Sequence, residues 1–227
     1  MRDLDEITEM ISSSAPFVSG IVISGGEPTL QREAVIALAR YARTLELKVA
    51  IQTNGLFPDT LDHLIREHLV DRIAIDYKTR WEGFSRVPGG YSVPVANYEM
   101  NLKKSIGICK KASREDILPE FEIVITAFYE NADYIGKISQ EIGTAPLVLQ
   151  QGEHKIIRMR ETAPDMTNGE YICKQRNLQE NHPPLTLAEL KSIADDLGRT
   201  VRIRTREIGE ISYESDWRRR DARKRKR

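Results

Sequence analysis

The stretch GIVISGGEPTLQ, residues 20–31, joins a short apolar run to a tight glycine turn and the start of a helical pattern. After Gly20, residues 21–23 are β-branched, which favours a strand. Gly25 and Gly26 reach backbone angles that other residues avoid, and Pro28 suits the first turn of a helix. The stretch therefore predicts a strand–turn–helix unit with the acidic residue Glu27 in its turn.

The rest of the chain repeats this unit, because runs rich in valine and isoleucine alternate with amphipathic segments. Near-continuous apolar strands are typical of a parallel sheet that is covered on both faces. Repeated strand–helix units predict an α/β fold, either a doubly wound sheet or a (β/α) barrel, whole or partial. We expect strands at 20–24, 47–52, 72–76, 121–126, 146–150 and 201–207, and helices at 3–13, 29–45, 58–69, 99–111, 131–142 and 186–198.

The predicted strand 20–24 raises a difficulty at the edge of this sheet. Only a helical pattern precedes it, so it would be an uncovered apolar edge, which natural proteins avoid. We therefore expect a partial barrel whose first strand is missing from the chain.

Composition narrows the class of protein. No apolar run approaches the roughly 18 residues that a membrane helix needs, and the N-terminus has no signal-peptide pattern, which predicts a cytoplasmic protein without a membrane partner. The two cysteines are too few for a disulfide framework. Cys109 has the spacing of a core residue and Cys173 lies in a polar segment. His63 and His68 have the wrong spacing for a shared metal ion on one helix, so we expect both at the surface or partly packed.

The C-terminus is strongly basic although the chain as a whole is neutral. The last ten residues, RRRDARKRKR, contain eight basic residues and one acid, a net charge of +7. Such a run is usually a solvated, disordered tail, and a specific contact with nucleic acid or an acidic partner is the less favoured alternative. We expect one domain at 1–211 and a tail at 212–227.

Polar residues follow the predicted strands. In both candidate folds ligands bind at the carboxyl ends of the strands, so these residues predict a site for a polar small molecule. Glycines in a turn serve backbone conformation alone or allow a ligand to approach the bare backbone. Carbonyl groups beside the carboxylate of Glu27 suit an ammonium group, whereas a phosphate loop lacks its Gly-Lys-Ser/Thr ending here. The residues are Ser24-Gly25-Gly26-Glu27, Gln52-Thr53-Asn54-Gly55, Asp76-Tyr77-Lys78, Thr126 and Gln150-Gln151-Gly152.

SGGEPTLQ, followed by IQTNG and IDYK at the next two strand ends, resembles the radical S-adenosylmethionine (SAM) superfamily. The resemblance is closest to the activating proteins of anaerobic ribonucleoside-triphosphate reductases, and LVLQQG and VRIRTREIGE extend it over most of the chain. It implies that Gly25, Gly26 and Glu27 contact the methionyl ammonium of SAM. It also implies that the cofactor's carboxylate and ribose are lined by Thr53, Asn54, Asp76 and Lys78.

The chemistry of the individual side chains is compatible with these implied roles. Lys78 can pair with a carboxylate, and Asp76 can accept from ribose hydroxyls, although a local ion pair between the two is the plain alternative. Gln150 and Gln151 have two equal interpretations, hydrogen bonds to adenine or to the neighbouring backbone.

The resemblance also implies a [4Fe-4S] cluster, held in the family by a C-x3-C-x2-C loop after the first strand. The chain contains no such motif. We expect the cluster cysteines upstream of Met1, or else a natural relative without a cluster. As written, the chain should not cleave SAM reductively.

The implied function is that of an oxidoreductase which generates a glycyl radical on anaerobic ribonucleoside-triphosphate reductase, with flavodoxin or ferredoxin as electron donor. Three alternatives stay open: another small radical SAM enzyme, such as a different activase or a deazaguanine-forming enzyme; a cluster-free SAM-binding or regulatory protein; and an unrelated α/β domain. The arginines of 202–206 suit either a partner contact or a solvated strand face.

Overall fold

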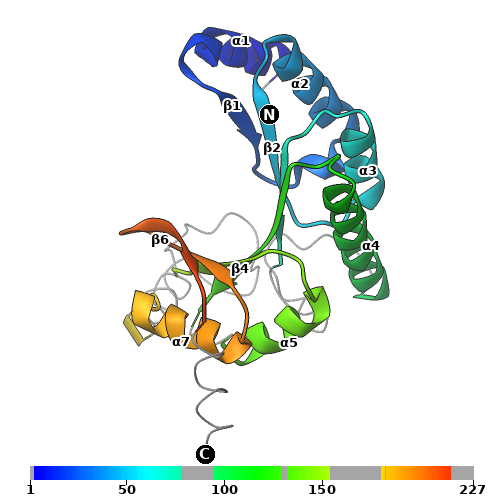
Figure 1. Cartoon of the computed structure of the whole chain (residues 1–227). Coiled ribbons are helices and arrows are strands. Elements are labelled where there is room, and N and C mark those ends of the chain that lie inside the picture. Colours follow the sequence, from blue (N-terminus) through cyan, green and yellow to red (C-terminus); the bar gives the residue numbers. More distant parts are fainter. Residues whose placement is uncertain (1–2, 78–94, 129–131, 154–179, 182, 216–227) are drawn as a thin grey trace, which may run out of the picture. The chain divides into compact units, whose positions relative to one another are not determined.

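A computed structural model describes residues 3–77, 95–128, 132–153, 180–181 and 183–215 (Figure 1). The chain divides into two compact units, the first comprising 1–85 and 91–124 and the second 86–90 and 125–227. The strand β4 (Glu120–Ala127) is shared by both units. Each unit is therefore described by itself.

The strands lie in the sheet in the order in which they occur in the sequence, β1-β2-β3-β4-β5-β6-β7. A doubly wound sheet would start in the middle and reverse its direction, whereas this order moves one strand at a time, as in a (β/α) barrel. β1 and β7 stand at opposite ends of the order, so the barrel is partial and does not close. The predicted α/β partial barrel is confirmed.

The first unit contains a parallel sheet formed by β1 (Gly20–Ile23), β2 (Lys48–Thr53), β3 (Arg72–Asp76) and the start of β4. β1 pairs with β2 alone among the described residues, and its Val22 is 59% exposed. It is the apolar edge strand that the sequence predicts. The core receives side chains from the helices as well as from the strands, and the two central strands contribute Val49, Ile51, Ile73 and Ile75.

Four helices accompany these strands: α1 (Leu4–Ser14), α2 (Arg32–Thr44), α3 (Pro58–Arg66) and α4 (Val95–Arg114). α1 packs on α2, and α3 packs on α4. The predicted helix at 29–45 is divided, because a 3-10 turn (Pro28–Leu30) precedes α2. A second short 3-10 turn follows α1 at Ala15–Phe17.

The second unit contains the end of β4, followed by α5 (Ala132–Ile142), β5 (Leu147–Gln151), α7 (Leu187–Leu197), β6 (Val201–Thr205) and β7 (Gly209–Tyr213). β5 and β6 are parallel, whereas β7 returns antiparallel to β6. This hairpin is absent from the sequence prediction, which ends in a single strand at 201–207. β7 continues past the expected tail boundary at 211, and residues 216–227 lie outside the described residues.

Two predictions about core and surface are confirmed in the first unit. Cys109 is fully buried on α4, where burial raises the pKa of its thiol to about 12. His68 is exposed and His63 is half-buried. Cys173 lies outside the described residues. Among the described helices, none has the length and apolar character needed to cross a bilayer.

Candidate functional site

The carboxylate of Glu27 is the centre of a hydrogen-bonded cluster at the carboxyl ends of β1 and β2. Its side chain is only 4% exposed. Oε1 accepts from the backbone N–H of Thr29 at 3.0 Å, from the Thr29 hydroxyl, and from the Thr53 hydroxyl at 2.6 Å. Oε2 accepts from the backbone N–H of Asn54 at 2.7 Å. Glu27 therefore ties the turn after β1 to the turn after β2.

All four donors to Glu27 are neutral, and within the described residues no lysine or arginine forms an ion pair with it. A buried charge is normally paired with an opposite charge, because removal from water is costly. Hydrogen bonds from neutral donors satisfy the lone pairs of the carboxylate without cancelling its charge. This geometry favours a cation as the ligand at this turn.

Gly25 and Gly26 leave open space beside this carboxylate. Their φ angles are +94° and +57°, in the region that favours glycine. A Cβ atom built on either residue meets no atom within 4 Å. Neither glycine is therefore required by close packing, and both expose bare backbone that a ligand can approach.

The turn after β2 is held from behind by α4. The buried Ser105 hydroxyl donates to the carbonyl oxygen of Gly55 at 2.7 Å, and the Asn101 side chain donates to that of Leu56 at 3.1 Å. Gly55 has φ +74°, and a Cβ there would lie 2.9 Å from Cδ1 of Leu102. Asn54 Oδ1 accepts from the backbone N–H of Leu56 at 3.0 Å, which leaves its amide nitrogen as a donor group.

Asp76 ends β3, the next strand of the same unit, and is half-buried. It lies near the phenol of Tyr98 on α4, and burial together with this negative charge raises the pKa of Tyr98 above its usual value. Six of the predicted residues therefore lie at neighbouring strand ends of this unit: Gly25, Gly26, Glu27, Thr53, Asn54 and Asp76. Lys78 lies outside the described residues.

Gln150, the remaining predicted site residue, belongs to the second unit. Its Oε1 atom accepts from the guanidinium of Arg204 at 3.2 Å. The neighbouring Gln151 donates to the carbonyl oxygen of Leu185 and accepts from the backbone N–H of Arg206. For Gln151 the backbone interpretation left open by the sequence is confirmed.

The arginines of 202–206 have partners inside the second unit. Arg202 and Arg204 both form ion pairs with Glu210 of β7, at 3.1 and 2.6 Å, and Arg206 pairs with Glu153. The two pairs with Glu210 lie across the hairpin that the sequence prediction lacks, whereas Glu153 follows β5.

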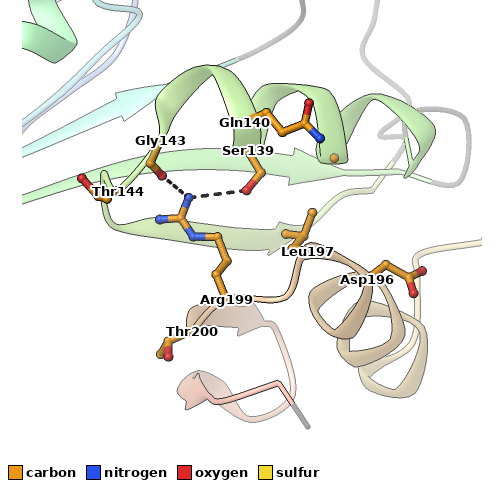
Figure 2. Close-up of a pocket in the computed structure, with 9 residues that line it drawn as sticks. Ser139, Gln140, Gly143, Thr144, Asp196, Leu197, Arg199 and Thr200 are labelled. Carbon is orange, nitrogen blue, oxygen red and sulfur yellow. Dashed lines mark hydrogen bonds between the residues drawn. The ribbon is translucent and has the colours of Figure 1, made fainter. Parts of the chain in front are cut away.

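A separate cavity of about 480 Å³ lies in the second unit, beside the ends of α5 and α7 (Figure 2). Arg199 projects into it and donates to the Gly143 carbonyl oxygen at 2.5 Å, to that of Ala145, and to the Ser139 hydroxyl at 3.4 Å. Desolvation lowers the pKa of this guanidinium. Since the cavity lies at the amino-terminal side of β5 and β6, it is at the opposite end of these strands from Gln150.

The residues of the chain do not fit an iron–sulfur cluster. The sequence has two cysteines and no C-x3-C-x2-C motif. Within the described ranges, no group of three His, Cys, Asp or Glu side chains could hold a metal ion. Cys109 is buried in a helix with a raised thiol pKa, the reverse of what a thiolate ligand requires.

Comparison with known proteins identifies the family of the chain. The family model of the radical SAM superfamily matches residues 1–142, more than half of the chain. The chain therefore belongs to the radical SAM superfamily.

Two relatives both carry the name "Putative glycyl-radical enzyme activating enzyme". The one from Methanocaldococcus jannaschii is 50% identical over 68 residues, which cover 30% of this chain and 28% of the relative. The one from Haemophilus influenzae is 24% identical over 173 residues, which cover 69% of this chain and 63% of the relative. In both cases the chain spans less than two thirds of the relative.

Among solved structures, a domain of pyruvate-formate lyase-activating enzyme from Bacteroides vulgatus is 18% identical. The similarity covers 83% of this chain and 99% of that domain, with a TM-score of 0.47.

Sequence reasoning missed the residues that support the site from behind. Thr29 is visible only as part of a helix start, yet its hydroxyl contacts Glu27. Asn101 and Ser105 are ordinary positions of an amphipathic helix, and no sequence signal distinguishes them. Their contacts join residues 45 and 50 positions apart in the chain.

Proposed function

We propose that this chain binds SAM at the carboxyl ends of its strands, as the SAM-binding part of an activating enzyme for a glycyl radical enzyme. The observation that carries the proposal is the buried carboxylate of Glu27, held by neutral donors beside the open backbone of Gly25 and Gly26. The methionyl group of SAM brings an ammonium group, which would supply the missing positive charge.

The proposed roles follow from the chemistry of each group. The carbonyl groups of the 25–26 turn accept from the ammonium, and Glu27 supplies the opposite charge. The Asn54 amide serves as donor to the carboxylate of the ligand, and Asp76 accepts from ribose hydroxyls. Lys78 as a carboxylate partner and Gln150 as an adenine contact remain predictions. Bound SAM is the source of radical chemistry in this family, and these residues bind and orient it.

Calorimetric titration of the chain with SAM tests this proposal. We expect saturable binding that Glu27→Gln weakens by about tenfold or more, because the countercharge is lost. Glu33→Gln is the matched control, since Glu33 is an exposed carboxylate at the start of α2, outside the site. Absence of SAM binding, or equal affinity of the Glu27→Gln variant, would contradict the proposal.

For the partner, we propose anaerobic ribonucleoside-triphosphate reductase, with an electron donor such as flavodoxin or ferredoxin serving the cluster-bearing form. The names of the two relatives support a glycyl radical enzyme as the class of partner. Cluster ligands would have to come from outside these 227 residues.

Biolayer interferometry, with the chain immobilised on the sensor, measures binding of each possible partner protein and so distinguishes between them. We expect binding to the glycyl radical subunit of the reductase and none to a pyruvate formate-lyase. The reverse preference would assign a different glycyl radical enzyme, and a radical signal in electron paramagnetic resonance would identify the substrate of a cluster-bearing form.

A cluster-free SAM-binding protein is the second candidate, because this chain has no set of cysteines for a cluster. SAM binding at full affinity without added iron and sulfide would favour it. A marked gain in affinity after anaerobic cluster reconstitution would favour the enzyme.

A further inference from the structure

We propose that Thr29 and Thr53 are positioning residues that hold the Glu27 carboxylate in place as a fixed countercharge, without touching the ligand themselves. This inference rests on the proposed SAM site. It differs from the role implied for Thr53 by family resemblance, which is to line the cofactor directly.

Both hydroxyl groups are turned inward. Thr29 is 1% exposed and Thr53 is 3% exposed, and both oxygens lie beside Oε1 of Glu27. The two hydroxyl oxygens are 3.2 Å apart. A carboxylate only accepts hydrogen bonds, so each hydroxyl can direct its single proton to Glu27, and the contact between the two hydroxyls is the alternative for one of them. In either arrangement both protons are used inside the cluster, and neither is left for a ligand.

Each threonine also accepts a hydrogen bond from another part of the chain. The Thr53 oxygen accepts from the backbone N–H of Gly55 at 3.0 Å. The Thr29 carbonyl oxygen accepts from the hydroxyl of Thr60, at the start of α3, at 3.0 Å. Each threonine is therefore held in position by a neighbouring turn or helix as well as by its contact with Glu27.

This double contact fixes the orientation of the carboxylate. Oε1 faces the two hydroxyls and the Thr29 N–H, so Oε2 is left to the N–H of Asn54. A carboxylate free to rotate would lose part of its attraction for an ammonium whenever it turned away, whereas a preorganised one does not. This clamp, formed by Thr29 and Thr53 around the Glu27 carboxylate, thus favours ligands that carry an amino group near the adenosine.

The test compares two ligands, SAM and 5′-methylthioadenosine, which shares the adenosine and sulfur but lacks the amino acid end. Calorimetry on Thr53→Val and Thr29→Val should show SAM binding weakened on the order of tenfold and methylthioadenosine binding unchanged. Thr53→Ser and Thr29→Ser retain the hydroxyl and should restore SAM affinity. Thr44→Val, which removes an exposed hydroxyl of the same unit, is the control.

A double-mutant cycle shows whether the threonines act through Glu27. In the Glu27→Gln background, Thr53→Val should cause little further loss of SAM affinity. Equal losses for both ligands, additive effects in the cycle, or SAM affinity unchanged in both valine variants would overturn the inference. Should Thr53→Val fail to fold, Thr29→Val with its serine rescue decides in the same way.

The outcomes for the two proposals are distinguishable. Failure of the unaltered chain to bind SAM overturns the proposed function and this inference with it. Binding by the unaltered chain with no selective effect of the valine variants overturns the clamp alone.

Discussion

Glu27→Gln exchanges one carboxylate oxygen for an NH2 group inside a ring of donors. Whichever way the amide is turned, its NH2 faces an N–H or a hydroxyl, so at least one buried donor loses its partner. We expect the free energy of unfolding to fall by about 1–3 kcal/mol. Urea denaturation without ligand measures it, and an unchanged midpoint would mean that the cluster is not formed in solution.

Replacement of glycine by alanine should have opposite effects on stability at Gly55 and at Gly107. Gly55→Ala places a Cβ 2.9 Å from Leu102 at a positive φ and should destabilise by about 1 kcal/mol or more. Gly107→Ala lies on the exposed face of α4, where a Cβ meets nothing within 4 Å, and should stabilise by about 0.5–1 kcal/mol. Thermal unfolding of both variants measures the change in stability. A change of the same sign in both variants would contradict the packing of α4 on this turn.

At the scale of whole elements, α7 carries a complete capping box. The Thr186 side chain accepts from the backbone N–H of Glu189, and the Glu189 carboxylate accepts from the backbone N–H of Thr186. Thr186→Ala should cost about 1 kcal/mol of stability. Denaturation at neutral pH, compared with the exposed Thr44→Ala, provides the check.

The same cap gives a pH dependence. Hydrogen bonds from Thr186 lower the pKa of Glu189 below its usual value. A lowered carboxyl pKa in the folded state contributes stability above the unfolded pKa, and this contribution is lost as the pH falls through the folded pKa. The stability difference between wild type and Thr186→Ala should therefore shrink in acid, below the ordinary range of glutamate. A difference that grew toward low pH would contradict this assignment.

Elements with a dense apolar pattern were predictable, because a parallel strand that is buried on both faces consists of a near-continuous run of apolar residues. Hairpin strand β7 was not, since its sequence GEISY carries one aliphatic residue and is stabilised by pairs such as Arg204 with Glu210. The site divides in the same way. The two glycines beside an acidic residue in one turn make Glu27 a predictable site residue. Its contact with the Thr53 hydroxyl is not predictable, because only the tertiary structure brings the two residues together.

Considered as a whole molecule, the chain offers one probe for each unit in its two cysteines. Cys109 lies in the core of the first unit, and Cys173 falls in sequence assigned to the second. In a Cys173→Ser variant, the reaction of Cys109 with a disulfide reagent should be at least about tenfold slower than that of an exposed thiol, because the pKa is raised and access is closed. Rapid labelling without denaturant would show that α4 is not packed as described.

One side of β1 has no neighbouring strand in the part of the chain that the structure describes, and this has a consequence for amide hydrogen exchange. Alternate N–H groups of a parallel edge strand point away from its neighbour, whereas a strand with neighbours on both sides bonds all of them. Protection along Gly20–Ile23 should therefore alternate from residue to residue, and that along Lys48–Thr53, between β1 and β3, should be continuous. Any molecule that adds a strand beside β1 would convert the alternating pattern into the continuous one, so exchange rates at four amides would report its arrival.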